Sequence, residues 1–220
     1  MSKRALPLLL SVAMGLSACG GPKPYDPDNP YPGYSYGDPV TIEIPVAPDR
    51  EGGASSDGLG GLSPNLIPIG DAADGTVHRA LAGFPLDAIP PGAQIVEAAL
   101  IVYVSGIELG APHEDLKRLF VDLVDFGEAV DAADFTDGVL LSTIGLLSKA
   151  SGEVVRSTDI TIAVVEALDQ GLPNADFRIR FDVPTNLDGG ADQVFLNGSE
   201  DLARSGVTTV LSVTFMEEIR

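Results

Sequence analysis

The sequence predicts an antiparallel, jelly-roll-like β-sandwich with one short helix. Short apolar segments with alternating polarity recur every 10 to 20 residues or so, roughly the spacing seen in sandwiches and barrels, and turn signals rich in Gly, Pro and Asp separate them. Strands do not alternate with long helical segments, so a doubly wound parallel sheet is not expected. The chain has 220 residues, which is ample for one well-packed core.

The N-terminus has the features of a secretory signal peptide. A basic start, residues 1–4, precedes an almost wholly apolar run over 5–16. This run is too short for a transmembrane helix, which needs about 20 apolar residues. We therefore expect residues 1–18 to be removed on export.

The end of this segment, Leu16-Ser17-Ala18-Cys19, resembles the bacterial lipobox, whose cysteine accepts a diacylglycerol. Cys19 is the only cysteine in the chain, so an internal disulfide is excluded. The resemblance implies a lipid anchor on Cys19, and the alternative is a plain signal peptide. In lipoproteins of this kind an Asp after the cysteine favours the inner membrane; because Gly20 stands there, the resemblance implies the outer membrane.

Residues 19–39 are expected to form an extended tether, followed by one domain over 40–220. Six prolines and four glycines in residues 20–39 exclude helix and central strand. Four of the five tyrosines also lie there. The segment is either a spacer or an aromatic contact segment for peptidoglycan or a partner protein.

The domain begins with a half-buried strand over 40–46, placed at a sheet edge by Pro45. Residues 50–61 are rich in Gly, Ser and Asp, which predicts a loop. Further strands are expected at 66–69 and 77–86. The strongest spans 95–104, with Ala98, Leu100, Val102 and Val104 facing inward.

The second half of the sequence is predicted to contain further strands and the one helix. The helix is expected over 162–170, ending at Gly171. In FRIRF (177–181), arginines alternate strictly with apolar residues, as in a two-faced strand. The other expected strands are 119–126, 154–161, 193–196 and 210–215.

The stretch RALAGFPLDAIPPGAQIVEAALIVYVSG, residues 79–106, is similar to the signature of the DNRLRE-type (CBM96-like) domain, R-A-L-L-R-F-D-L-x-x-I-P-x-G-A. Weaker similarities in the same order extend over about residues 40–216. The resemblance implies a jelly-roll-like sandwich in an extracellular protein, with sugar binding in some members. Gly83 and Pro85 replace charged positions of that pattern, and its tryptophan is absent, so roles of those residues cannot be transferred.

Composition argues against several functions. The chain has 13 Lys and Arg against 32 Asp and Glu, a net charge of −19, so nucleic acid and anionic lipid headgroups are not expected partners. No nucleophile motif occurs, and the two histidines, His78 and His113, are interpreted as structural or solvated. We therefore expect no enzyme activity and no obligatory cofactor.

Calcium is the one metal that the sequence suggests. Asp182, Asn186, Asp188 and Asp192 lie in one loop around a Gly-Gly pair and offer the oxygen ligands that calcium prefers. A second acidic loop contains Asp131, Asp134 and Asp137. The alternative in both places is a solvated acidic loop.

Sugar sites usually stack the ring on an exposed aromatic side chain. Within 40–220 the only Tyr or Trp is Tyr103, which by parity faces away from the core. The sequence thus supports a lipid-anchored envelope protein that displays a non-catalytic module with a structural or interaction role. The alternative is a carbohydrate-binding lipoprotein. The expected contact surfaces are the polar loops 50–61, 109–118 and 182–192.

Overall fold

The computed structural model describes residues 35–63, 65–136, 138–147, 155–199 and 208–219. Residues 36–220 belong to one compact unit. The predicted signal peptide, Cys19 and most of the tether lie outside the described residues. In the described part, no helix is both long and apolar enough to span a membrane.

The described chain contains fourteen strands and two α-helices, with two short 3₁₀ turns. The elements are β1 (Ser35–Tyr36), β2 (Val40–Pro45), η1 (Pro48–Arg50), β3 (Glu51–Ser55), β4 (Gly60–Leu62), β5 (Leu66–Asp71), β6 (Val77–Pro85), β7 (Gln94–Leu109), α1 (Pro112–Asp115), β8 (Leu119–Val124), η2 (Ala133–Phe135), β9 (Val139–Leu146), β10 (Val155–Asp159), α2 (Thr161–Asp169), β11 (Asn174–Phe181), β12 (Asp192–Asn197), β13 (Val210–Met216) and β14 (Glu218–Ile219).

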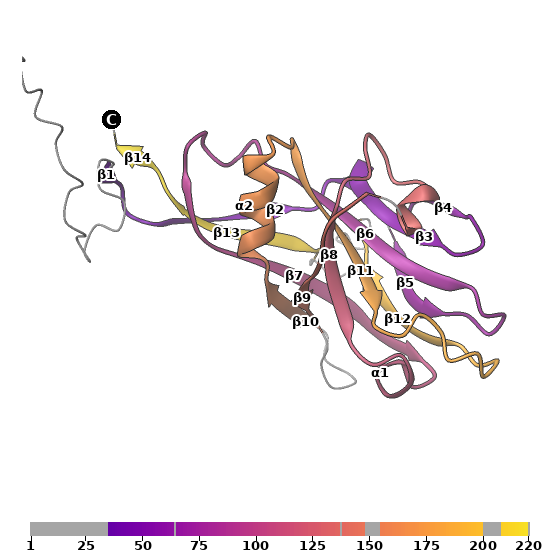
Figure 1. The fold of residues 1–220 in the computed structure, drawn as a ribbon. Coiled ribbons are helices and arrows are strands. Elements are labelled where there is room, and N and C mark those ends of the chain that lie inside the picture. The colour runs from indigo at the N-terminus through magenta and orange to yellow at the C-terminus, as the bar shows by residue number, and fades with distance from the viewer. Residues whose placement is uncertain (1–34, 64, 137, 148–154, 200–207, 220) are drawn as a thin grey trace, which may run out of the picture. The chain divides into compact units, whose positions relative to one another are not determined.

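Twelve of these strands form one antiparallel sheet that curls into two layers, so the predicted all-β, sandwich-like fold class is confirmed (Figure 1). The first layer contains β2, β13, the first part of β7 and β10. The second contains β12, β5, β6, β11, β8 and β9, together with β3, which pairs with β6, and β4, which pairs with β3. The long strand β7 belongs to both layers, because Leu100 pairs with Leu211 of β13 and Val104 pairs with Leu196 of β12.

The core lies between the layers and follows the predicted alternation. Leu100 is 0% exposed and Val102 is 1% exposed, whereas Ile101 between them is half-buried on the outer face. Among the strands that the structure describes, β2 pairs with β13 alone, so the edge position expected from Pro45 is also confirmed.

The predicted helix is present as α2, which packs against β7 and β11. Its buried positions are Ala163, Val164 and Ala167. Gly171 follows the helix with φ +69°, a conformation that glycine adopts without strain. Its N–H donates to the Leu168 carbonyl at 3.0 Å and that of Leu172 donates to Ala167 at 2.9 Å, the hydrogen bonds of a Schellman ending.

The prediction that residues 50–61 form a loop is wrong. They contain β3 and the start of β4, and β3 is mostly buried because it also pairs with β6. A Cβ on Gly52 would lie 2.2 Å from the carbonyl oxygen of Gly61. The glycines therefore allow two backbones to approach closely, instead of marking a flexible connection.

Two further elements of the structure were not indicated by the alternation of polar and apolar residues. Strand β9 pairs with β8 through an irregular register, so its side chains do not follow a simple two-residue period. Helix α1 occupies four residues of the expected loop 109–118.

Candidate functional site

The outer face of β6, β11 and β8 carries charged side chains that the fold covers. Together with Arg50 of η1, which bonds Asp176, we call this set the buried charge layer; it comprises Arg50, Arg79, Asp122, Asp176, Arg178 and Arg180. The alternation of FRIRF sends Phe177 and Ile179 into the core and the two arginines to this outer face. The segment 125–136 packs over it, with Phe126, Val130 and Phe135 in a second apolar cluster.

Asp122 on β8 is the centre of this layer. It is 1% exposed and accepts hydrogen bonds from Arg180 Nε at 2.8 Å, Arg178 Nη2 at 3.3 Å and the Thr143 amide at 2.8 Å. Burial by itself raises the pKa of Asp122, but these hydrogen bonds and the two guanidinium charges hold the pKa below its ordinary value. The residue is therefore a carboxylate that joins β8, β9 and β11.

Arg50 and Asp176 form a second buried pair. Arg50 Nη2 lies 2.6 Å from Asp176 Oδ2 and Nε lies 3.2 Å from Oδ1, a bidentate arrangement. Burial raises the pKa of Asp176, and the hydrogen bonds from Arg50 oppose that rise. Arg50 also donates to the Gly127 carbonyl at 2.9 Å and stacks over Phe126 at 4.7 Å, so it fixes the covering segment.

Gly83 makes room for this pair. A Cβ at Gly83 would lie 2.4 Å from Asp176 Oδ1 and 2.9 Å from Arg50 Nε. This is the position at which the signature quoted above has an arginine.

Arg79 completes the layer. It donates to the Phe135 carbonyl and lies 4.1 Å from the centre of the Phe135 ring. Burial, together with the charges of Arg178 and Arg180, lowers its pKa to about 10, so Arg79 stays cationic at neutral pH. The layer as a whole binds parts of the fold to one another.

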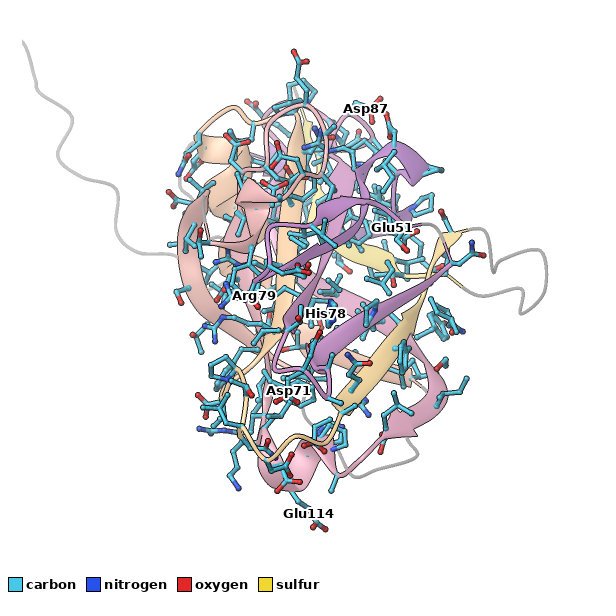
Figure 2. The ribbon with its side chains drawn as sticks, turned by 90° about the vertical axis from the view of Figure 1, so that its right-hand side faces the viewer. Glu51, Asp71, His78, Arg79, Asp87 and Glu114 are labelled. Carbon is cyan, nitrogen blue, oxygen red and sulfur yellow. The ribbon has the colours of Figure 1, made fainter. Side chains whose placement is uncertain are left out.

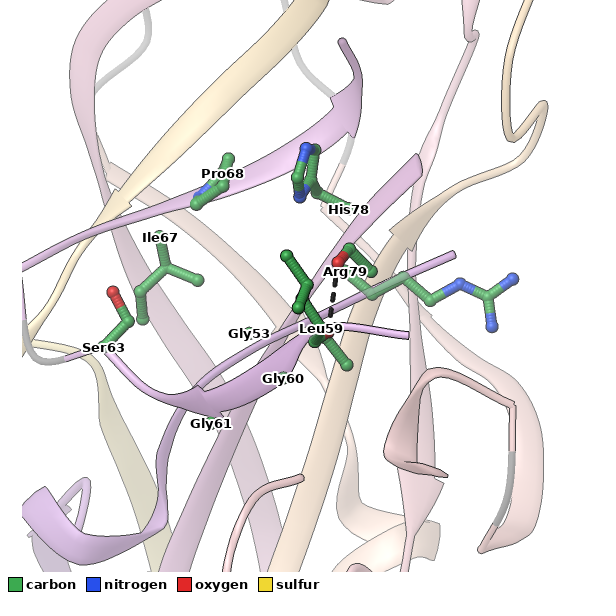
Figure 3. A pocket seen from close by; sticks show the side chains of 11 residues that line it. Gly53, Leu59, Gly60, Gly61, Ser63, Ile67, Pro68, His78 and Arg79 are labelled. Atoms are coloured by element: carbon green, nitrogen blue, oxygen red, sulfur yellow. Dashed lines mark hydrogen bonds between the residues drawn. The ribbon is translucent and has the colours of Figure 1, made fainter. Parts of the chain in front are cut away.

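A hollow of about 220 Å³ lies where β5 separates from β6 and β3 takes its place. We call it the β5–β6 hollow; it is lined by Gly53, Ala54, Ser55, Leu59, Gly60, Gly61, Ser63, Ile67, Pro68, His78 and Arg79. Figure 3 shows His78 and Pro68 on one side, with the Arg79 guanidinium pointing away from both. Ser55 holds the loop at the opposite wall by donating from its hydroxyl to the Leu59 carbonyl at 3.0 Å.

His78 provides the principal polar side chain of this hollow. Burial lowers its pKa, and the opposing charges of Asp57 and Asp74 moderate the change. The imidazole is therefore mostly neutral at pH 7, with one donor and one acceptor nitrogen. It shares the parity of Ala80 and Phe84, as the sequence predicts, and lies between the labelled Asp71 and Glu51 in Figure 2.

The second histidine belongs to a separate cluster. His113 lies 3.9 Å from Glu108 and packs against the Phe181 ring at 5.5 Å, so it is less solvated than expected. Burial and the neighbouring Arg156 both lower its pKa.

Tyr103 lies on the outer face of β7, as its parity predicts. It is half-buried and pairs across the sheet with Val155, which is 48% exposed. Ile101 and Val210 form the next cross-strand pair on this face. Tyr103 is thus part of an apolar outer face of β7 and does not line the β5–β6 hollow.

The four predicted calcium ligands do not converge on one point. Asp182 faces Arg118 at 3.6 Å, and Asp188 accepts the Gly190 amide at 2.6 Å within its own turn. Asp192 is buried and accepts hydrogen bonds from the Ala111 amide and from Asn186 Nδ2, at 2.7 and 2.9 Å. Throughout the described ranges, no three His, Cys, Asp or Glu side chains are grouped so as to hold a metal ion. Calcium at this loop stays a prediction.

In the second acidic loop, Asp131 and Asp134 accept hydrogen bonds from backbone amides of the same turn. Asp137 lies outside the described residues. The sequence did not indicate the β5–β6 hollow. The available signals were the glycines of 52–61, which were interpreted as a loop, and Pro68 inside a strand.

Comparison of the chain with protein-family models and with curated proteins finds no match. The resemblance to the DNRLRE-type domain therefore stays a prediction.

Proposed function

We propose that this chain is a lipid-anchored protein of the bacterial cell envelope whose β-sandwich is a non-catalytic module with a structural or interaction role. The lipobox-like Leu16-Ser-Ala-Cys19 supports the anchor, and Gly20 supports the outer membrane. The Pro- and Gly-rich segment 20–39 would hold the module away from the bilayer.

The observation that supports a non-catalytic role is that the buried carboxylates are bonded to arginines of the domain itself. Asp122 and Asp176 are each fully engaged with arginines and with the strands and loops around them. General acid–base catalysis needs a group within hydrogen-bond reach of a substrate. Asp122 instead faces Arg178, Arg180 and the Thr143 amide of β9. Asp176 faces Arg50 and the Phe126 amide of the covering segment. Both carboxylates therefore stabilise the domain.

The test is a screen of the purified chain for glycoside hydrolysis, lyase and esterase turnover, with His78→Ala as the matched variant. The proposal predicts no turnover that depends on this residue. A turnover that His78→Ala abolishes would overturn the non-catalytic role.

The second candidate is a carbohydrate-binding lipoprotein. The β5–β6 hollow favours it, because a volume of about 220 Å³ suits one small ring and His78 offers a hydrogen-bonding nitrogen beside apolar walls. Membership of the DNRLRE-type family, proposed from the sequence, points the same way. Binding on a glycan array that His78→Ala weakens would support the β5–β6 hollow as the site. Binding that Tyr103→Ala abolishes would instead place the site on the apolar outer face of β7.

A further inference from the structure

A second hollow of the domain lies between the β6–β7 connection and the end of α2. Its volume is about 580 Å³, and we call it the α2 trough. It is lined by Leu86, Asp87, Ile89, Pro90, Pro91, Gly92, Ala93, Leu168, Asp169, Gly171, Leu172 and Pro173. The Leu86 amide donates to the Pro173 carbonyl at 3.0 Å, which joins the two walls.

The trough combines an apolar floor with an acidic border. Leu86 and Ile89 are buried beneath it, and Leu168 and Leu172 are half-buried. Asp87 and Asp169 are exposed, and none of the lining residues is basic. The C-terminal end of α2, which carries partial negative charge, also borders it.

The carboxylates of Asp87 and Asp169 differ from most loop carboxylates of the domain in having no hydrogen-bond partner among the described residues. Asp57, Asp74 and Asp188 each accept a hydrogen bond from an amide of their own turn. Within the described part of the chain, the side chains of Asp87 and Asp169 form no hydrogen bond or ion pair. A third carboxylate, Glu218, is near, because its Oε2 lies 3.8 Å from where a Cβ on Gly92 would be.

We propose that the α2 trough binds a lysine side chain of a basic segment in a partner protein. A lysine has an apolar four-carbon stem and a compact cationic head. The stem matches the leucine and proline floor, and the ammonium matches the unpaired carboxylates at the border. The charge complementarity favours a basic partner over a second copy of this chain, which carries 32 acidic against 13 basic residues.

This inference rests on the proposed role as an interaction module and names the chemistry of its partner. The probe is the fluorescently labelled peptide Gly-Lys-Pro-Lys-Gly, titrated into the chain purified in a nonionic detergent at low salt. A peptide with norleucine at both lysine positions keeps the stems and removes the charges. Peptide-induced shifts of the Gly92 and Gly171 amide resonances locate the binding.

The matched variants change the net charge equally. Asp87→Asn with Asp169→Asn removes the two border carboxylates, and Asp182→Asn with Asp188→Asn removes two exposed carboxylates of another loop. That loop is tied to Asp71 by the Asn186 amide at 3.3 Å, and Asp71 lies well away from Asp87 in Figure 2.

We expect the border variant and the norleucine peptide each to weaken binding at least about tenfold, with the control variant within about twofold. Equal weakening by both variants would overturn the proposal in favour of general charge attraction. The proposal would also be overturned if the norleucine peptide bound as tightly as the lysine peptide, or if binding did not saturate. The same holds if the peptide shifted amide resonances elsewhere in the domain and left those of Gly92 and Gly171 unchanged. None of these outcomes affects lipid anchoring or the turnover screen, so failure of the trough is distinguishable from failure of the proposed function.

Discussion

The substitution Asp122→Asn tests whether the buried charge layer holds the sandwich together. Asp122 is 1% exposed and faces Arg178, whose side chain is 4% exposed, and Arg180, whose side chain is 20% exposed. The asparagine keeps the shape but removes the charge and places an amide donor against other donors. Both guanidinium groups then lose their counter-charge.

The expected cost follows from this burial. Removing one partner of a buried pair costs about 3 to 5 kcal/mol. Because the Arg180 side chain is partly exposed and can be hydrated, we expect a loss of about 3 kcal/mol, at the lower end of this range. For a domain of this size, that loss corresponds to a fall in Tm of roughly 6 to 12 °C. The measurement is urea unfolding of both proteins at pH 7, followed by circular dichroism.

Asp182→Asn is the matched control, because Asp182 pairs with Arg118 at 3.6 Å on the surface, with side chains 42% and 58% exposed. An exposed pair contributes about 0 to 1 kcal/mol, so this variant should be nearly as stable as the wild type. Similar losses in the two variants would refute the reasoning that burial makes Asp122 important.

The pH dependence provides a second check on Asp122. Its pKa is lowered in the folded state, so its stabilisation is complete above the unfolded pKa of about 3.9 and is lost as the pH falls through the folded pKa. The difference in unfolding free energy between wild type and Asp122→Asn should therefore narrow below about pH 4. A difference that is constant from pH 7 to pH 2 would contradict the cause assigned to the lowered pKa.

Three further predictions concern the core, a close contact and calcium. Leu100→Ala should lower the free energy of unfolding by about 2 to 5 kcal/mol and Ile101→Ala by much less, since Leu100 is fully buried; equal losses in denaturant melts would contradict the two-faced assignment of β7. Gly83→Ala should cost about 1 to 3 kcal/mol because its Cβ would meet Asp176 at 2.4 Å, whereas Gly37→Ala, whose Cβ has only an ordinary contact at 3.9 Å, should be neutral in the same melts. Millimolar calcium should leave Tm unchanged relative to chelator if the 182–192 loop keeps this arrangement, because its carboxylates do not converge and already face Arg118, Asn186 or backbone amides; a clear rise in Tm would contradict this and support the calcium site that the sequence suggests.

The strands that alternate cleanly could be predicted from the sequence, because alternation directly reports one buried and one outer face. Helix α2 is found within one residue of its predicted bounds, and β7 begins within one residue of its predicted start but continues to Leu109, past its predicted end at 104. Strand β3 could not be predicted in this way. Its glycines have no side chains that could alternate between two faces. They are required because the backbone of Gly61 lies close to Gly52, and this contact is visible only in the tertiary structure.

The charged face of β11 shows a different limit. The sequence indicates that Arg178 and Arg180 lie opposite the core, and it gives no sign that the segment 125–136 covers Arg178. Their partner Asp122 is more than fifty residues away in sequence, and only strand pairing brings it opposite Arg178. The β5–β6 hollow likewise arises from the separation of two strands, which no local pattern encodes.

The most direct test of the account is the intact mass of the protein extracted from membranes of cells that express it. The account predicts a chain that begins at Cys19 and carries the added mass of a diacylglycerol on its thiol, and it predicts that Cys19→Ala moves the protein to the soluble envelope fraction. A chain that begins elsewhere without lipid, or a Cys19→Ala variant that still partitions into the detergent phase, would contradict the lipid-anchored module.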